Sequence, residues 1–211
     1  MRETPTVETR SLDAIPVAHT PPGGYGSSFP APVLDGCREP LVADAPDLRG
    51  LWRVIAVEVR GWPVGDSHPA YRHVERIEQC GDRLVITGGG VIHDMRCDGT
   101  LEHGLHDVAV RNYSSEVNAV ATYEAGMHVI RPAGTAARLR NLMRRNTLEI
   151  TRELDDGEMV WTYATFAARL RRIGGPNDLP PAELPPLEPV LPAEPVLSME
   201  PELPPESEPR R

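Results

Sequence analysis

The sequence contains no lysine, so all 22 of its basic residues are arginine, and 31 acidic residues give it a formal net charge of −9. An acidic chain is poorly suited to bind nucleic acid, whose phosphates require a positively charged face. No stretch approaches the about 20 consecutive apolar residues of a membrane-spanning helix, so we expect no membrane span. The absence of lysine beside abundant arginine, alanine and proline indicates a GC-rich bacterial genome.

Cysteine is scarce: Cys37, Cys80 and Cys97 are an odd number, and no two of them form a CxxC motif. A disulfide framework normally uses an even number of cysteines in a secreted protein, so we expect reduced thiols. The N-terminus, MRETPTVETR, has no apolar segment behind its charges and does not resemble a secretory signal. Together these features predict a cytoplasmic protein.

Proline divides the chain, since eight of its 23 prolines fall in residues 1–46, three in 47–175 and twelve in 176–211. We predict a mostly disordered segment rich in Pro and Gly over residues 1–46, with one short stretch lying on the folded domain. Residues 47–173 are long enough for one domain with a single core. Residues 174–211 are predicted to be a disordered acidic tail, because dense proline blocks helix and sheet hydrogen bonding.

The tail carries two-thirds of the net charge, since Asp178 and seven Glu against Arg210 and Arg211 give −6. It repeats Leu or Val, Pro and Glu, a composition that favours the extended polyproline II conformation. Two interpretations follow. The tail either keeps the protein soluble or docks onto a protein partner that recognises polyproline II.

Residues 50–172 contain short stretches rich in Val, Ile, Thr, Tyr and Trp, separated by turn residues every eight to twelve positions. This pattern predicts an all-β domain, and sequential short turns favour a single antiparallel up-and-down β-barrel of 8–10 strands, which leaves no exposed edges. The predicted strands cover residues 50–60, 72–79, 83–88, 90–97, 106–113, 116–124, 127–132, 136–144, 147–154 and 159–171.

The clearest hairpin turns at Asp156-Gly157, a pair that suits a two-residue type I′ turn because glycine accepts a positive φ. Its register pairs Arg152 with Trp161. Alternate residues then form an apolar face and a polar face. We predict that the face with Arg152, Trp161 and Tyr163 points into the barrel. A shift of the register by one residue would turn the other face inward and bury unpaired glutamates.

Two further hairpins extend this assignment. With a turn at Ala125-Gly126, Tyr123 faces His128 on the more apolar side, which we place inside the barrel. A third hairpin, around Gly81 and the residue after it, gathers four residues on one face: Ile77, Gln79, Leu84 and Ile86.

A guanidinium inside a barrel is costly to bury unless a partner satisfies it. Arg152 either stacks on Trp161 as a cation–π pair and bonds to backbone carbonyls, or meets a polar or acidic group of a ligand, aided by Tyr163. The second role predicts that the barrel binds a small, largely hydrophobic molecule, with Tyr123 and Trp161 against its body.

Two alternatives stay open beside ligand binding. The same cavity could serve an enzyme, a cyclase, isomerase or lyase, in which His93, His128 or Tyr163 acts as the acid–base group. In the other alternative the barrel is filled by side chains, and the protein is an interaction module that works through its tails.

The domain opens on Gly50-Leu51-Trp52, a Gly-x-Trp motif at the start of the first predicted strand. With the many-stranded meander and the arginine-bearing last strand, residues 50–172 resemble the calycin superfamily of lipocalins and fatty-acid-binding proteins. The resemblance implies that Trp52 packs across one end of the barrel, beneath an Arg of the last strand. Arg169 is the candidate for that Arg.

The sequence also departs from this superfamily. The connection after the first strand, GWPVGDSHPA, is too short for the helix–turn–helix lid of fatty-acid-binding proteins. Their Arg-x-Tyr carboxylate clamp is absent from the last predicted strand, where Trp161-Thr162-Tyr163 stands. The Gly-x-Trp-x-Gly signature of the haem-binding branch is missing, and no His follows His128. We predict no cofactor.

Residues 93–107 concentrate side chains of the types that bind metals, but their spacing matches no zinc signature. We predict no metal site there. The segment is either a solvated loop with a few residues lining the cavity or the source of a His–Asp acid–base pair. His93 shares a face with Val91 and Met95, so it reaches the interior either as a core histidine or as a ligand contact. The residues concerned are His93, Asp94, Cys97, Asp98, His103, His106 and Asp107.

Overall fold

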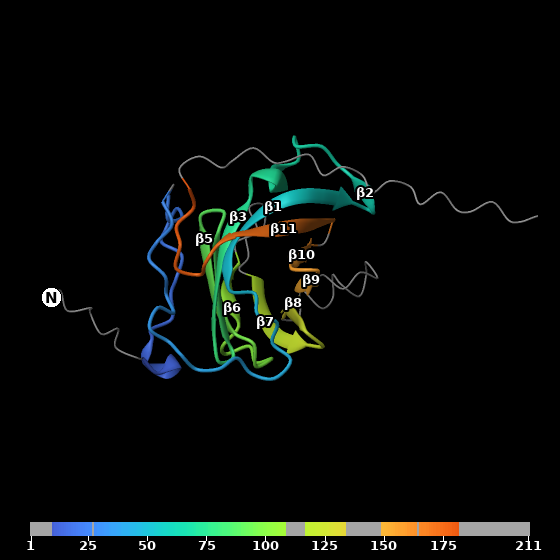
Figure 1. The fold of residues 1–211 in the computed structure, drawn as a ribbon. Helices are drawn as coiled ribbons and strands as arrows, with labels where there is room; N and C mark the ends of the chain where they lie inside the picture. Colours follow the sequence, from blue (N-terminus) through green and yellow to red (C-terminus); the bar gives the residue numbers. More distant parts are fainter. Residues whose placement is uncertain (1–9, 27, 109–116, 134–148, 164, 182–211) are drawn as a thin grey trace, which may run out of the picture.

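The structure, a computed structural model, describes residues 10–26, 28–108, 117–133, 149–163 and 165–181. Two short 3-10 helices, η1 (Leu12–Ala14) and η2 (Pro69–Arg72), accompany the strands, and no helix in these ranges has the length and apolar composition needed to cross a membrane. The strands (Figure 1) are β1 (Gly50–Val59), β2 (Trp62–Pro63), β3 (Val74–Cys80), β4 (Arg83–Gly88), β5 (Val91–Arg96), β6 (Leu105–Val108), β7 (Val117–Glu124), β8 (Met127–Pro132), β9 (Ile150–Asp155), β10 (Glu158–Tyr163) and β11 (Phe166–Gly174).

Within the described residues, ten strands form one antiparallel sheet in the order β5-β4-β3-β1-β11-β10-β9-β8-β7-β6, and β2 pairs with β1 alone. Pairing of β1 with both β3 and β11 joins the first and last strands. The sheet curls until the chain after β5 meets β7, where Asp98 forms a bridge with Thr122. The Gly99 amide also donates to the Ala121 carbonyl at 2.9 Å. The fold is the predicted all-β, up-and-down barrel.

All three predicted hairpin registers are confirmed. Arg152 lies opposite Trp161 and Tyr123 opposite His128, and the third hairpin places its four predicted residues on one face, with Ile77 opposite Ile86. The turn between β9 and β10 has positive φ at both central residues, 52° at Asp156 and 80° for the glycine that follows. A type I′ turn requires this geometry.

The prediction of a single strand over residues 159–171 was wrong. The chain turns back between β10 and β11, so that Tyr163 pairs with Phe166. The run WTYATFAARL contains no Gly, Pro, Asn or Asp, so it lacks the residues that usually mark a turn. The predicted strand 136–144 lies outside the described residues, as does the predicted strand 106–113 beyond Val108.

Trp52 is fully buried near the start of β1, and its indole nitrogen donates to the Leu48 carbonyl at 2.7 Å. An Arg of the last strand does lie over it, but the residue is Arg172, with its guanidinium carbon 4.6 Å from the ring centroid. The prediction for Arg169 was therefore wrong. Because β11 continues to Gly174, the residue opposite Trp52 lies three positions further along the strand than predicted. Arg169 is partly exposed and pairs with Asp155.

The N-terminal segment before the barrel runs along the outer face of β3, β4 and β5 (Figure 1, blue). Leu12, Ile15 and Leu34 pack there on Val85 and Ile92 in a second hydrophobic cluster. The sequence analysis assigned only one short stretch of residues 1–46 to the domain surface, whereas the contacts of the described residues begin at Leu12 and continue to Pro46, which accepts from Gln79. The pattern was missed because the segment lacks periodicity and is anchored by irregular contacts rather than by a ladder.

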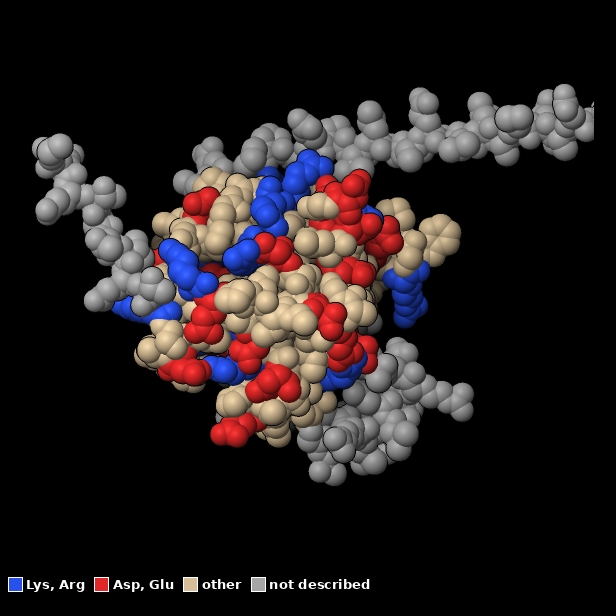
Figure 2. All heavy atoms as spheres, turned by 60° about the horizontal axis from the view of Figure 1, so that its bottom comes forward, with Lys and Arg blue, Asp and Glu red and all other residues tan. Residues whose placement is uncertain are grey.

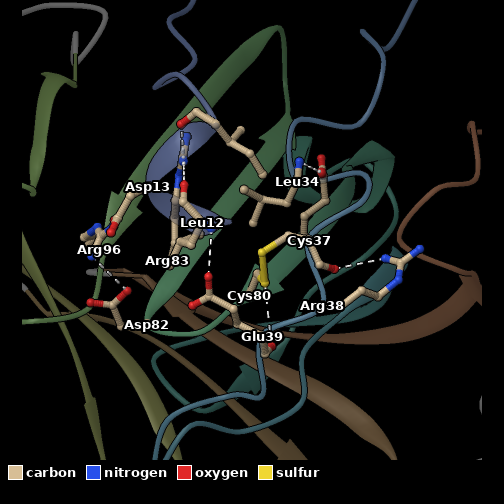
Figure 3. Close-up of a disulfide and its surroundings, with 12 residues drawn as sticks. Leu12, Asp13, Leu34, Cys37, Arg38, Glu39, Cys80, Asp82, Arg83 and Arg96 are labelled. Atoms are coloured by element: carbon tan, nitrogen blue, oxygen red, sulfur yellow. Dashed lines mark hydrogen bonds and ion pairs between the residues drawn. A yellow bond between two sulfur atoms is a disulfide. The ribbon is translucent and has the colours of Figure 1, made fainter. Parts of the chain in front are cut away.

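A disulfide joins this segment to the end of β3 (Figure 3). Cys37 and Cys80 are 43 residues apart in sequence, with their Cα atoms 6.2 Å apart. The prediction that these thiols are reduced was wrong, because one disulfide and one buried free thiol, Cys97, also give an odd count. Burial raises the pKa of Cys97 to about 12. The cytoplasmic prediction thereby loses the support that it drew from reduced cysteines.

The outer surface mixes charges of both signs. Figure 2 shows acidic and arginine side chains interspersed over the face that it presents. Several surface charges form ion pairs, as Arg131 does with Glu124 and Glu149. Exposed pairs of this kind contribute little stability.

Candidate functional site

Six charged side chains are buried among the described residues, and they fall on two faces of the sheet. Four lie on the outer face, where they contact the N-terminal segment. The other two, Glu75 and Arg152, lie inside the barrel and bond to each other. The four outer residues are Arg76, Glu78, Arg83 and Asp94.

Arg152 extends from β9 toward β3, which lies four places away in the sheet order, so the Glu75–Arg152 pair crosses the barrel interior. The contact is bidentate: Nε and Nη2 donate to the two carboxylate oxygens of Glu75, each at 2.9 Å. Only 4% of Arg152 and 1% of Glu75 are exposed. The predicted inward orientation of Arg152 is confirmed.

The Arg152 guanidinium carbon also lies 5.2 Å from the centroid of the Trp161 ring. The stacking alternative is therefore present, with a carboxylate in place of backbone carbonyls as the hydrogen-bonding partner. Trp161 contacts further rings, with centroids 5.1 Å away at Phe166, 6.1 Å at Tyr163 and 5.0 Å at His73. Phe166 and its partner Tyr163 lie at the opposite end of the β1–β11 ladder from Trp52, since Phe166 pairs with Val59.

His73 and His128 complete the surroundings of the ion pair. His73 Nε2 donates to the second Glu75 oxygen at 3.1 Å, and His128 lies beside Arg152 in register on β8 with no exposed surface. We call His73, Glu75, His128, Arg152 and Trp161 the interior polar cluster.

Burial shapes the protonation of this cluster. Burial and, to a smaller extent, the neighbouring Arg152 charge lower the pKa of His128 to about 3. Burial raises the pKa of Glu75, but the charge of Arg152 and hydrogen bonds from His73 and Arg152 outweigh it, so this pKa lies well below its ordinary value. At neutral pH the cluster therefore holds one carboxylate, one guanidinium and a neutral His128.

Four nitrogen atoms of the interior polar cluster are buried and lack a hydrogen-bond partner among the described residues. They are Arg152 Nη1, Trp161 Nε1 and both ring nitrogens of His128. More than nine-tenths of buried polar groups in proteins have a partner, in the protein or in bound water. Their gathering around one ion pair gives the interior an unused capacity for hydrogen bonding.

The other predicted site residues lie at different depths. Tyr163 is half-buried beside Trp161 and Phe166. The Tyr123 hydroxyl accepts from Gln79 Nε2 at 2.9 Å, and burial raises its pKa. His93 is half-buried on β5, opposite Ile86. The structure thus brings Arg152, Trp161 and His128 together and places Tyr123 beside His128 and Tyr163 beside Trp161.

Sequence reasoning missed Glu75 and His73. Part of the signal was available, because the predicted shared face of Ile77 and Gln79 continues by alternation to Glu75. His73 lies just before the strand, where alternation no longer applies.

The metal-type residues of 93–107 are divided among separate partners. Asp94 accepts two bonds from Arg83, and His103 contacts Asp98 at 2.6 Å on the surface. Among the described residues, no group of three or more His, Cys, Asp or Glu side chains could hold a metal ion. The side chain of Asp107 lies outside the described part of the chain.

The strand order, the near closure of the sheet and the stacking of Arg172 on Trp52 define a calycin-like β-barrel, as the resemblance predicted. No protein-family model and no curated protein matches the sequence. Among solved structures, a mutant of the fluorescent protein UnaG is similar, with 11% identity and a TM-score of 0.43, over 59% of this chain and 95% of that one. A mutant of the fatty acid transporter REP1-NXSQ is similar with 14% identity and a TM-score of 0.39, over 60% and 98%.

Proposed function

We propose that the protein binds a small, largely apolar molecule inside its barrel and holds a polar group of that molecule at the interior polar cluster. The unpartnered nitrogens of Arg152, Trp161 and His128 carry this proposal. A bound polar group would satisfy them, and the neighbouring aromatic and aliphatic side chains would surround the apolar body, as in typical small-molecule sites.

A probe and a matched pair of variants test this function. Nile red, a neutral apolar dye, is titrated into the wild type, Trp161→Phe and Trp62→Phe, and neutral amphiphiles are then used to displace it. We expect Trp161→Phe to weaken an amphiphile about fivefold, the equivalent of one hydrogen bond. Trp62 is 76% exposed on β2, so its variant serves as the control. Absence of Nile red binding would reject the proposal.

One observation favours a second candidate, acid–base catalysis in the same barrel: the 3.1 Å contact between His73 and Glu75. A carboxylate partner fixes the tautomer and orientation of a histidine. The predicted acid–base residue His128 has no such partner among the described residues and a pKa of about 3. If the purified protein consumes a metabolite of its host, His73→Gln is expected to abolish turnover and to retain binding.

The cytoplasmic location and a protein partner for the acidic tail remain predictions. Most of the tail lies outside the described residues. Disulfides persist mainly in oxidising compartments, so fractionation of the native host is the direct test of location.

A further inference from the structure

The charge balance of the interior polar cluster limits which polar group of a ligand it can bind. This inference rests on the proposed function, the binding of a ligand inside the barrel. Of the buried charged side chains in the described ranges, Glu75 and Arg152 alone face the interior. Their contact is bidentate, and both partners are almost completely buried. The interior therefore already contains the anion that neutralises Arg152.

A ligand carboxylate would bring a second negative charge beside Glu75. It would have to displace Glu75 from Arg152 or share one guanidinium with it, in surroundings that favour neutral groups over uncompensated charges. Glu75 is in addition held by His73 at 3.1 Å. Moving the Glu75 carboxylate out of its place would break three hydrogen bonds, two from Arg152 and one from His73.

The unpartnered atoms of the cluster are mostly donors. Arg152 Nη1 and Trp161 Nε1 carry only N–H groups, and a neutral His128 has one donor and one acceptor. Arg152 and Trp161 are direct cross-strand neighbours, with the guanidinium carbon 5.2 Å from the Trp161 ring centroid, so both donors belong to one small region, where an oxygen with two lone pairs would meet them. A carbonyl oxygen has this property without bringing a charge.

We propose that the polar group of the ligand is a neutral carbonyl, as in an amide, ester, ketone or lactone with an apolar body, and not a carboxylate. Glu75 selects for it by occupying the face of Arg152 that an acid would use. Specificity then arises partly from repulsion of the wrong ligand.

Two compounds of one chain length test this selection. Dodecanamide and dodecanoate are used to displace Nile red from the wild-type protein at pH 8, where the acid is ionised. We expect the amide to bind at least about tenfold more tightly, the factor that 1.4 kcal/mol of unfavourable charge produces. Tighter binding of dodecanoate would overturn the inference and leave the proposed function standing.

The variant Glu75→Gln keeps the shape of the side chain and removes its charge. Because Arg152 is then uncompensated, we expect the preference to invert in favour of dodecanoate. Glu153→Gln makes the same change of charge on the outward face of β9 and should keep the wild-type preference. An unchanged preference in Glu75→Gln would contradict the inference, and if that variant does not fold, the wild-type comparison decides alone. If Nile red does not bind at all, the proposed function fails first.

Discussion

Glu75 and Arg152 are 77 residues apart in the sequence and form a bidentate ion pair inside the barrel, with both N–O distances 2.9 Å. Neither strand could keep its charged residue inside without the other, because an unpaired buried charge is strongly destabilising. The pair therefore ties the β3 side of the barrel to the β9 side and sets the charge that a ligand encounters.

Removing one member of the pair should destabilise the fold. We expect Arg152→Met to lower the free energy of unfolding by about 3–5 kcal/mol, because it leaves Glu75 buried without its partner. The double variant with Glu75→Met should recover part of this loss, as measured by urea denaturation. Arg169→Met, at a partly exposed ion pair, should change stability by less than about 1 kcal/mol. Additive losses in the double variant would show that the two residues are not coupled.

Stability should also fall on mild acidification because of His128. Its folded-state pKa of about 3 lies below the unfolded value of 6.5, so between these values the unfolded chain takes up a proton that the folded chain does not. Stability is therefore lost as the pH decreases through this window. Between pH 7 and pH 5 this effect of His128 should lower the free energy of unfolding by about 2 kcal/mol.

Urea denaturation at both pH values, with His128→Phe and the exposed control His106→Phe, measures this effect. The fall in stability should shrink only in the His128 variant. An equal fall in both variants would locate the titrating group elsewhere.

The disulfide predicts a specific thiol count. In the folded, unreduced protein we expect no rapid reaction with iodoacetamide, because Cys97 is buried and its pKa is raised to about 12. Denaturation should expose one reactive thiol, and reduction should raise the number to three. Three reactive thiols without reduction would show that Cys37 and Cys80 are not bonded.

Loss of this disulfide should loosen the N-terminal segment. The bond closes a loop of 43 residues, for which chain entropy gives a stabilisation of up to about 4 kcal/mol. We expect Cys37→Ser to lower the melting temperature and to expose residues 10–46 to limited proteolysis. Cleavage at the same rate as in the wild type would contradict this account.

The sequence predicted the barrel well where turn residues and alternation act together. The turns at Gly126 and Gly157 set the register of two hairpins, and each register then determined which side chains point inward. The turn between Tyr163 and Phe166 was not predictable in this way, because no glycine, proline, asparagine or aspartate marks it. The expected partner of Trp52 was wrong for a separate reason: the last strand continues to Gly174, so Arg172 and not Arg169 lies opposite Trp52.

Contacts between distant segments were beyond local patterns. The Arg152 side of the interior polar cluster follows from one hairpin, but its partner Glu75 comes from another strand, and nothing in the spacing pairs them. The N-terminal segment is held by side chains of the sheet that accept from its amides, as Glu78 does from Leu34 at 2.7 Å. Such contacts leave no periodic signal in the segment itself.

The central claim, that a ligand accepts hydrogen bonds at the interior polar cluster, is tested most directly at the three indole N–H groups. They differ in environment: Trp52 Nε1 donates to a backbone carbonyl, Trp62 is exposed, and Trp161 Nε1 is buried without a partner among the described residues. In nitrogen–proton correlation spectra, titration with dodecanamide should move the Trp161 resonance downfield and leave that of Trp52 in place, with Trp161→Phe confirming the assignment. A titration that moves only the Trp62 resonance, or none of the three, would contradict binding inside the barrel.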